Sequence, residues 1–298
     1  MRIAMVNDKL SLEKYIELAQ KENKALYEVM LADNAKEMDT APIALEAKMQ
    51  EMLQVMQESI TFGLTGVKSR SGLTGGSAKT LAEAMAKPKY QSLLGPVAQD
   101  ALVYALAVSE ANAAMGRIVA APTAGASGVL PGVLFALKKH RNLSNIDLQK
   151  GLIVAGNIGM VIASRASLSG AMGGCQAECG SAGAMAAGAA VSMLGGTPEQ
   201  VGHAVAIVLK NMLGLVCDPV AGLVEVPCIK RNGGSAMQAL LAAEMALAGI
   251  TSFIPADEAI DAMKEVGDKM PCALRETADG GLAHTPTALA WAKRYFSK

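Results

Sequence analysis

Apolar residues recur every three or four positions along most of the chain, and few segments alternate with a period of two. Valine and isoleucine are scattered through these helical patterns rather than gathered into strand-like runs. The pattern therefore predicts an all-α fold. Helices are expected over 11–32, 42–60, 96–115, 129–140, 146–168, 180–195, 198–213, 232–248, 256–267 and 286–297.

Two of these helix starts carry local signals. Thr197-Pro198-Glu199-Gln200 combines a capping hydroxyl, a proline at the first helical position and a glutamine that reaches back. Thr40-Ala41-Pro42 gives a similar start to the second helix. The first two helices have charged outer faces, so residues 1–62 are expected to form an N-terminal helical layer. Residues 63–298 are expected to form a second helical domain that carries the functional site, in one continuous structural unit with that layer.

Gly-, Ser- and Pro-rich segments lie between the helical patterns and mark the candidate functional region. The stretch 63–79 is predicted to be a long loop. Four shorter joints follow, at 117–132, 169–180, 216–234 and 277–286. Because polar turns between rigid helices often bind ligands, we look for chemistry there.

Composition narrows the class of protein. Hydrophobic residues make up 51% and charged residues 18%, which favours a folded chain with a large core. The net charge is zero and the basic residues are dispersed, so neither nucleic acid nor a membrane is an expected partner. The N-terminal sequence lacks a signal-peptide pattern, and five cysteines suit reduced thiols better than a disulfide framework. A cytoplasmic location is expected.

Three cysteines on these joints are candidate metal ligands. Cys175, Cys217 and Cys228 are separated by 41 and 10 intervening residues, each beside Gly or Pro. Thiolates are soft ligands for iron-sulfur clusters, zinc or copper. The alternative is that each is a small buried hydrophobic side chain. Cys179 forms C-x3-C with Cys175, whereas Cys272 is interpreted as a plain thiol.

Long motifs around these cysteines resemble the iron-sulfur L-serine dehydratases of bacteria, in particular the alpha chain of the two-chain form. The motifs are GGCQAECGSAGAMAAGA, LVCDPVAGLVEVPCIKRN and MGRIVAAPTAGASGVLPGVL, together with the loop SRSGLTGG. The resemblance implies that Cys175, Cys217 and Cys228 hold a 4Fe-4S cluster. Cys179 does not belong to the ligand pattern of that family.

The resemblance also implies the reaction, in which L-serine is converted to pyruvate and ammonia. With three protein thiolates, one iron stays free to act as a Lewis acid on the substrate hydroxyl. The chain lacks the separate small domain of the single-chain enzymes and its Ser-His-Thr-type motif, so a beta-chain partner is expected. The proton acceptor is left open among a serine, a lysine and a residue of another chain.

Two loops are candidates for binding the substrate carboxylate. The turn from Pro122 to Gly128 offers backbone amides at a helix start, with Thr123, Gly125 and Ser127 as contacts. An ordinary Gly-rich connection is the alternative. Ser69 and Arg70 offer a hydroxyl and a cation, although solvated loop charges would also explain them. His284 and the Lys230-Arg231-Asn232 run are further candidates, whereas His140 and His203 are expected to face solvent.

Three rival interpretations stay open from the residues alone. A pyridoxal-phosphate dehydratase catalyses the same reaction but needs a Schiff-base lysine, usually on an α/β scaffold. A non-catalytic helical scaffold subunit would use its cysteines only for packing. A structural zinc site is the third alternative.

Overall fold

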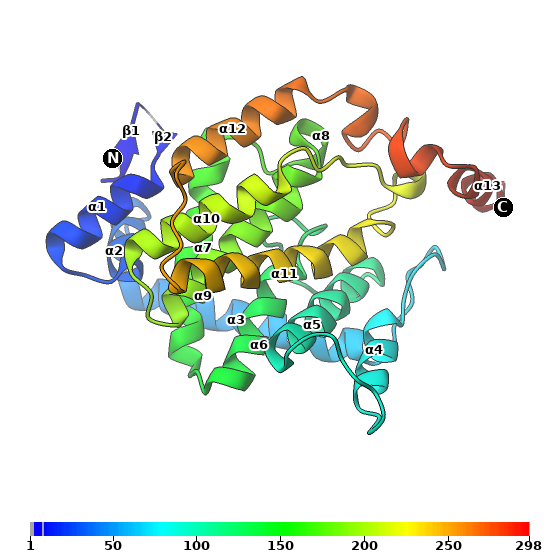
Figure 1. Ribbon diagram of the computed structural model, residues 1–298, viewed down its shortest axis with the longest axis horizontal. Coiled ribbons are helices and arrows are strands. Elements are labelled where there is room, and N and C mark those ends of the chain that lie inside the picture. The colour runs from blue at the N-terminus through cyan, green and yellow to red at the C-terminus, as the bar shows by residue number, and fades with distance from the viewer. Residues whose placement is uncertain (1–2, 8, 298) are drawn as a thin grey trace.

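The computed structural model describes residues 3–7 and 9–297, and this part of the chain is mainly helical (Figure 1). The predicted all-α class is confirmed. The strands found in the described residues are two short ones, β1 (Met5–Val6) and β2 (Lys9–Leu10). They pair antiparallel, with Met5 opposite Leu10.

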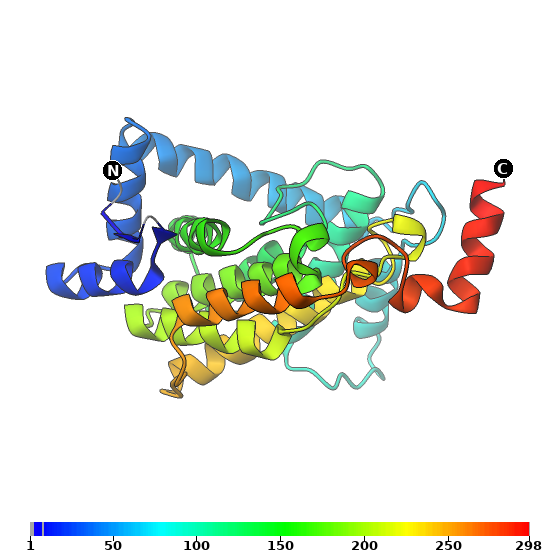
Figure 2. The ribbon, with the colours of Figure 1, turned by 90° about the horizontal axis from the view of Figure 1, so that it is seen from above.

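The first part of the chain, from Leu12 to Leu64, forms three helices rather than the predicted two. These are α1 (Leu12–Glu22), α2 (Leu26–Glu37) and α3 (Pro42–Leu64). The single helix predicted over 11–32 is wrong because Asn23 takes a left-handed conformation with φ 51°, which ends α1. Asparagine tolerates that conformation better than most residues. The predicted start at Pro42 is confirmed, and Figure 2 shows α3 lying across one side of the other helices.

An Ala- and Gly-rich helix lies at the centre of the bundle. In α9 (Ser181–Met193) every residue except Ser192 is buried. Its neighbours are α6 (Val129–Arg141), α7 (Asn145–Arg165), α10 (Pro198–Met212) and α11 (Cys228–Leu247). Small residues permit this crowding: a Cβ on Gly188 would lie 2.2 Å from Ile158 Cδ1. The capping box predicted at Thr197 and Gln200 is confirmed.

Helix α7 is a core helix. Among the described residues it is the one helix that is long and apolar enough to cross a bilayer, yet 61% of its most apolar window is buried inside the protein. A buried core helix accounts for this composition.

Two other boundaries differ from the predicted ones. Helix α11 begins at Cys228 rather than 232, directly after Pro227. Helix α4 (Ser77–Met85) begins inside the predicted loop 63–79. Its first amides are capped from α5 (Pro96–Ala113), where buried Glu110 accepts from Ser77 N at 2.7 Å and from Ala78 N at 3.2 Å. A cap supplied 33 residues away leaves no local signal in the sequence.

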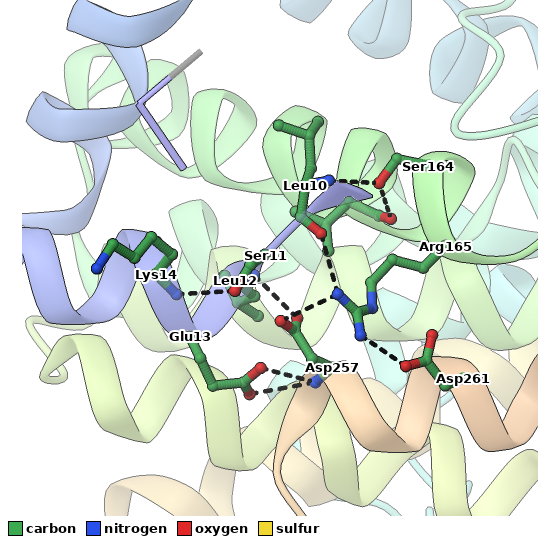
Figure 3. Close-up of polar contacts among 10 residues, drawn as sticks. Leu10, Ser11, Leu12, Glu13, Lys14, Ser164, Arg165, Asp257 and Asp261 are labelled. Atoms are coloured by element: carbon green, nitrogen blue, oxygen red, sulfur yellow. Dashed lines mark hydrogen bonds and ion pairs between the residues drawn. The ribbon is translucent and has the colours of Figure 1, made fainter. Parts of the chain in front are cut away.

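The two ends of the chain lie on opposite sides of the molecule in both views (Figures 1 and 2). Near the N-terminus, Arg165 links Leu10 O to Asp257 and Asp261 of α12 (Ala256–Lys269), as Figure 3 shows. Near the C-terminus, short turns η3 (Cys272–Leu274) and η4 (Gly281–His284) lead to α13 (Pro286–Phe296). Helix α13 stands apart from the main bundle (Figure 2).

Candidate metal centre and substrate site

Three cysteines from distant segments meet at one end of the helix bundle. Cys175 follows α8 (Gly170–Gly173), Cys217 lies in the segment after α10, and Cys228 is the first residue of α11. Their exposed fractions are 2%, 3% and 6%. The charge of Cys175 contributes to the raised pKa values of both Cys217 and Cys228, so the three thiols are electrostatic neighbours.

Burial and mutual charge act differently on the three thiols. Burial is the main cause that raises the pKa of Cys217, and it raises the pKa of Cys228 to about 12. The pKa of Cys175 is lowered, chiefly by a hydrogen bond from Cys179 and also by the charge of Arg231. Two of the thiols therefore resist ionisation unless a cation or metal compensates the charge.

A π-helical turn, η1 (Gln176–Gly180), holds Cys175 in place. Gln176 is buried and anchors the turn on both sides. Its Nε2 donates to Met263 O at 2.9 Å, and its Oε1 accepts from Gly214 N at 2.9 Å. Single π-helical turns inside helices occur often at functional sites.

Arg231 and Asp218 tie the cysteine segments together from the other side. Arg231 donates to Val216 O at 2.7 Å and to Asp218 Oδ1 at 2.9 Å, and its charge lowers the pKa of the Cys175 thiol. Asp218 Oδ2 accepts from Leu282 N at 2.7 Å. The sequence analysis named Arg231 only as part of a basic run and did not name Asp218, which is one of several site residues that it missed.

The C-terminal segment reaches the same place through backbone pairing. Cys217 N donates to Leu274 O at 2.9 Å, and Glu276 N donates to Cys217 O at 2.7 Å. This short parallel bridge brings the Glu276 side chain beside the thiols. The joint predicted at 277–286 therefore begins directly after the residues that pair with Cys217, which are Leu274 and Glu276.

Glu178, on the π-helical turn, is another site residue that the sequence reasoning missed. Its Oε1 accepts from Thr123 Oγ1 at 2.9 Å. Burial raises its pKa; the Thr123 bond opposes this effect, and the charge of Glu276 adds to it. A signal was present, because Glu178 is the one acidic residue in the Gly- and Cys-rich joint 169–180.

The donor set consists of three buried thiols, which are soft ligands for a metal ion or an iron-sulfur cluster. Among the described residues, no group of three or more His, Cys, Asp or Glu side chains is placed to hold one metal ion. The thiolates of a cubane bind separate iron atoms, so they need to surround the cluster rather than converge on a point. The three buried thiols, which come from separate segments, supply ligands of the type that such a cluster needs.

Comparison with known proteins identifies the family of the chain. The family model described as "Serine dehydratase alpha chain" matches residues 21–283. The chain belongs to the serine dehydratase alpha chain family. A relative from Bacillus subtilis, named "Probable L-serine dehydratase, alpha chain", is 51% identical over 286 residues, covering 96% of this chain and 95% of the relative. The "L-serine dehydratase, alpha chain" of Peptoniphilus asaccharolyticus is 43% identical over 278 residues, covering 91% and 93%.

Longer relatives match only in part. The "L-serine dehydratase" of Streptomyces coelicolor is 50% identical over 183 residues, which cover 61% of this chain but 40% of that protein. The rest of that longer protein lies outside the match with this chain.

Two of the predicted carboxylate contacts lie beside the cysteine turn in this family member. Thr123 bonds to Glu178, and a Cβ on Gly125 would lie 3.4 Å from Glu178 Oε1. Asn232 fixes the loop to α11, because its Nδ2 donates to Gly125 O at 2.7 Å and its Oδ1 accepts from Gly128 N at 2.9 Å. Ser127 is fully buried, and its hydroxyl has no hydrogen-bond partner in the described protein.

Ser69 and Arg70 are less directly connected to the thiols. The Ser69 hydroxyl is buried and bonds within its own loop, to Ser71 Oγ at 3.1 Å and Thr74 N at 3.2 Å. Arg70 is exposed. The loop reaches the cysteine segment through Glu225, which lies three residues before Cys228.

The remaining candidates have different environments from one another. Cys179 is buried and bonds to Cys175, whereas Cys272 and His284 are exposed. His140 and His203 were predicted to face solvent, but both are half-buried and bonded to other residues. His140 is half-buried against Asp100 at 2.5 Å, and His203 accepts from Ser252 N at 3.3 Å.

Proposed function

We propose that this chain is the alpha chain of an L-serine dehydratase, which converts L-serine to pyruvate and ammonia. The observation that carries the proposal is the meeting of three buried thiols in a chain of this family. Relatives that match over almost their whole length carry that activity in their names. We further propose that Cys175, Cys217 and Cys228 hold a 4Fe-4S cluster.

A cluster held by three thiolates supplies an iron atom that acts as a Lewis acid and assists departure of the substrate hydroxyl. The protein's own residues have other tasks. Arg231 places a positive charge beside the Cys175 thiol, which favours the thiolate that a metal requires. The π-helical turn and Gln176 fix the direction of Cys175.

The Thr123–Ser127 turn is proposed to hold the substrate carboxylate. Asn232 fixes its backbone on both sides, at Gly125 and at Gly128. A rigid loop loses little conformational freedom when it binds a small anion, and backbone amides near a helix start suit a carboxylate. Ser127 has an unused buried hydroxyl close by in sequence. Ser69 and Arg70 are kept as contacts that reach the site from the neighbouring loop.

A beta chain is proposed as partner. The printed names of the nearly full-length relatives call them alpha chains, and longer relatives match this chain over only 40% of their own length. A cytoplasmic location is proposed because the five cysteines are unpaired, which suits a reducing compartment.

The test is to purify the chain without oxygen, with and without a co-expressed beta chain, and to measure iron, sulfide and pyruvate formation from L-serine. We expect about four irons per alpha chain and activity that needs the partner. Cys175→Ser, Cys217→Ser and Cys228→Ser should each lose iron and activity. Cys272→Ser is the matched control, and Cys179→Ser should keep its iron. Full iron content in the Cys217→Ser protein would disprove the cluster assignment.

A further inference from the structure

An apolar groove runs beside α11, at a distance in sequence from the cysteine segments. It has a volume of about 470 Å³ and lies between the start of α5 and helices α6, α9 and α11. Aliphatic side chains make up most of its walls, among them Leu94, Val97, Leu137, Met237, Leu240 and Leu247. Because apolar surface is unfavourable in water, the groove is suited to receive an apolar side chain.

Two loops next to the groove present large apolar side chains to solvent. Leu93 is fully exposed in the loop that leads into α5, and it directly precedes Leu94 of the groove wall. Phe253 is 95% exposed in the loop that follows α11. Figure 2 shows both loops projecting beyond the helices on the same side of the molecule. The groove and the two apolar tips therefore belong to one face.

Hydrogen bonds hold both loops in these exposed positions. Gln99 on α5 donates to Leu94 O, one residue after the first tip. Lys210 on α10 donates to Ser252 Oγ at 2.8 Å, one residue before the second tip. Side chains on loops that are already fixed lose little conformational freedom when they bind, so both tips are prepared for insertion into another surface.

The charged residues of this face complement one another. Lys87 and Lys89 lie on the loop of Leu93, and Glu244 lines the groove. All three are exposed, and no salt bridge joins them to other residues in the part of the chain that the structure describes. Arg141, the other charged residue of the groove, lies in the last turn of α6, where the helix dipole favours a cation. The carboxylate and the two lysines are thus available to pair across an interface.

An interface between two identical chains related by a two-fold axis needs both halves of every contact on one face. This face has an apolar tip beside a groove, and a cationic loop beside an unpaired carboxylate. We propose that two copies of the chain associate through it, with Leu93 of each copy in the groove of the other. Lys87 and Lys89 of one copy then pair with Glu244 of the other, and Phe253 packs at the edge. The inference does not depend on the proposed function.

Sedimentation velocity of the full chain at about 1 to 100 µM tests this association. We expect a species of twice the chain mass of 30.7 kDa. Leu93→Asp puts a charge into the apolar groove, so the dissociation constant of the dimer should rise roughly thirtyfold or more. Leu289→Asp makes the same change at an exposed leucine of α13 and should leave that constant unchanged. A wild-type chain that stays monomeric, or a Leu93→Asp dimer as tight as the wild type, would overturn the inference.

Charge reversal separates a second copy from any other occupant of this face. Glu244→Lys should weaken the dimer roughly threefold or more at low salt, and so should Lys87→Glu combined with Lys89→Glu. All three substitutions in one chain should restore the dimer, because both sides of each pair are then reversed. A triple variant weaker than either parent would overturn the inference.

A beta chain is the other candidate occupant. If the wild-type chain is monomeric and Leu93→Asp instead weakens its binding to a co-purified beta chain, the face belongs to the alpha–beta contact and the two-fold assignment is wrong. Pyruvate formation does not enter this test, so its failure and the failure of the proposed function are distinguishable.

Discussion

The guanidinium of Arg231 donates to Asp218 Oδ1 at 2.9 Å, and the two side chains expose only 17% and 4% of their surface. Asp218 also accepts from Leu282 N, so a single carboxylate joins α11 to the C-terminal segment. The charge of Arg231 in turn lowers the pKa of Cys175. The ion pair therefore couples the docking of the C-terminal segment to the geometry of the thiols.

Removing Asp218 is expected to destabilise the protein strongly. Asp218→Ala leaves the Arg231 charge buried without its partner, which typically costs about 3 kcal/mol of unfolding free energy. Urea unfolding of the purified chain measures this cost. Asp268→Ala is the control, because its partner Lys264 is exposed and such pairs contribute about 0–1 kcal/mol. Equal effects of the two substitutions would contradict the coupling.

Glu225 is expected to hold the 69–76 loop against the cysteine segment. It accepts from Ser71 Oγ at 2.9 Å and from Thr74 Oγ1 at 2.8 Å. Glu225→Ala removes both bonds to a charged acceptor, so the loop should open more often, at a cost of about 2 kcal/mol. Trypsin should then cut faster after Lys68 and Arg70, with the fragments identified by mass.

Glu83→Ala, on the exposed face of the adjoining helix α4, is the control for the loop. Its cleavage rate at Lys68 and Arg70 should equal that of the wild type. Unchanged cleavage in Glu225→Ala would show that the hydroxyl bonds do not hold the loop.

What the sequence predicts well is local in origin. The helical period gives the all-α class, and the Thr197 and Gln200 side chains act within one turn, so their capping box was predictable. Resemblance singled out three cysteines that the structure brings together from segments 41 and 10 residues apart. Spacing alone left each of them open to a packing interpretation.

What the sequence does not predict depends on contacts between distant segments. Helix α4 is capped by Glu110 and the 69–76 loop is held by Glu225, in both cases by a carboxylate far away in the chain. Glu178 acquires its place from Thr123, 55 residues earlier. Asn23 is a different case. Asparagine tolerates the left-handed conformation that ends α1, but the sequence around it does not require that conformation.

Close approach of α3 and α5 depends on Gly63. A Cβ at this position would lie 1.9 Å from Ala107 O, so Gly63→Ala must push the helices apart. We expect a loss of about 2 kcal/mol in unfolding free energy. Gly234→Ala is the matched control, since it meets nothing within 4 Å and lies within α11. It should stabilise the protein by about 0.5–1 kcal/mol. A stabilising Gly63→Ala would contradict the packing.

Glu13 is expected to make stability depend on pH. Its carboxylate accepts from Asp257 N at the start of α12, with both oxygens 3.1 Å away (Figure 3). Burial, a side-chain hydrogen bond with Asp257 and the charge of Asp257 raise the pKa of Glu13 from its ordinary value of 4.5 to about 8. Between these two values the folded state keeps a proton that the unfolded state releases, so stability falls as the pH rises from about 4.5 to 8.

Glu13→Gln removes this titration while keeping an oxygen that can accept from Asp257 N. The variant should therefore gain stability relative to the wild type as the pH increases from 5 to 8, as measured by urea midpoints at each unit of pH. Glu17→Gln, on the exposed face of the same helix, should run parallel to the wild type. Parallel curves for Glu13→Gln and the wild type would show that the Glu13 proton is not retained on folding.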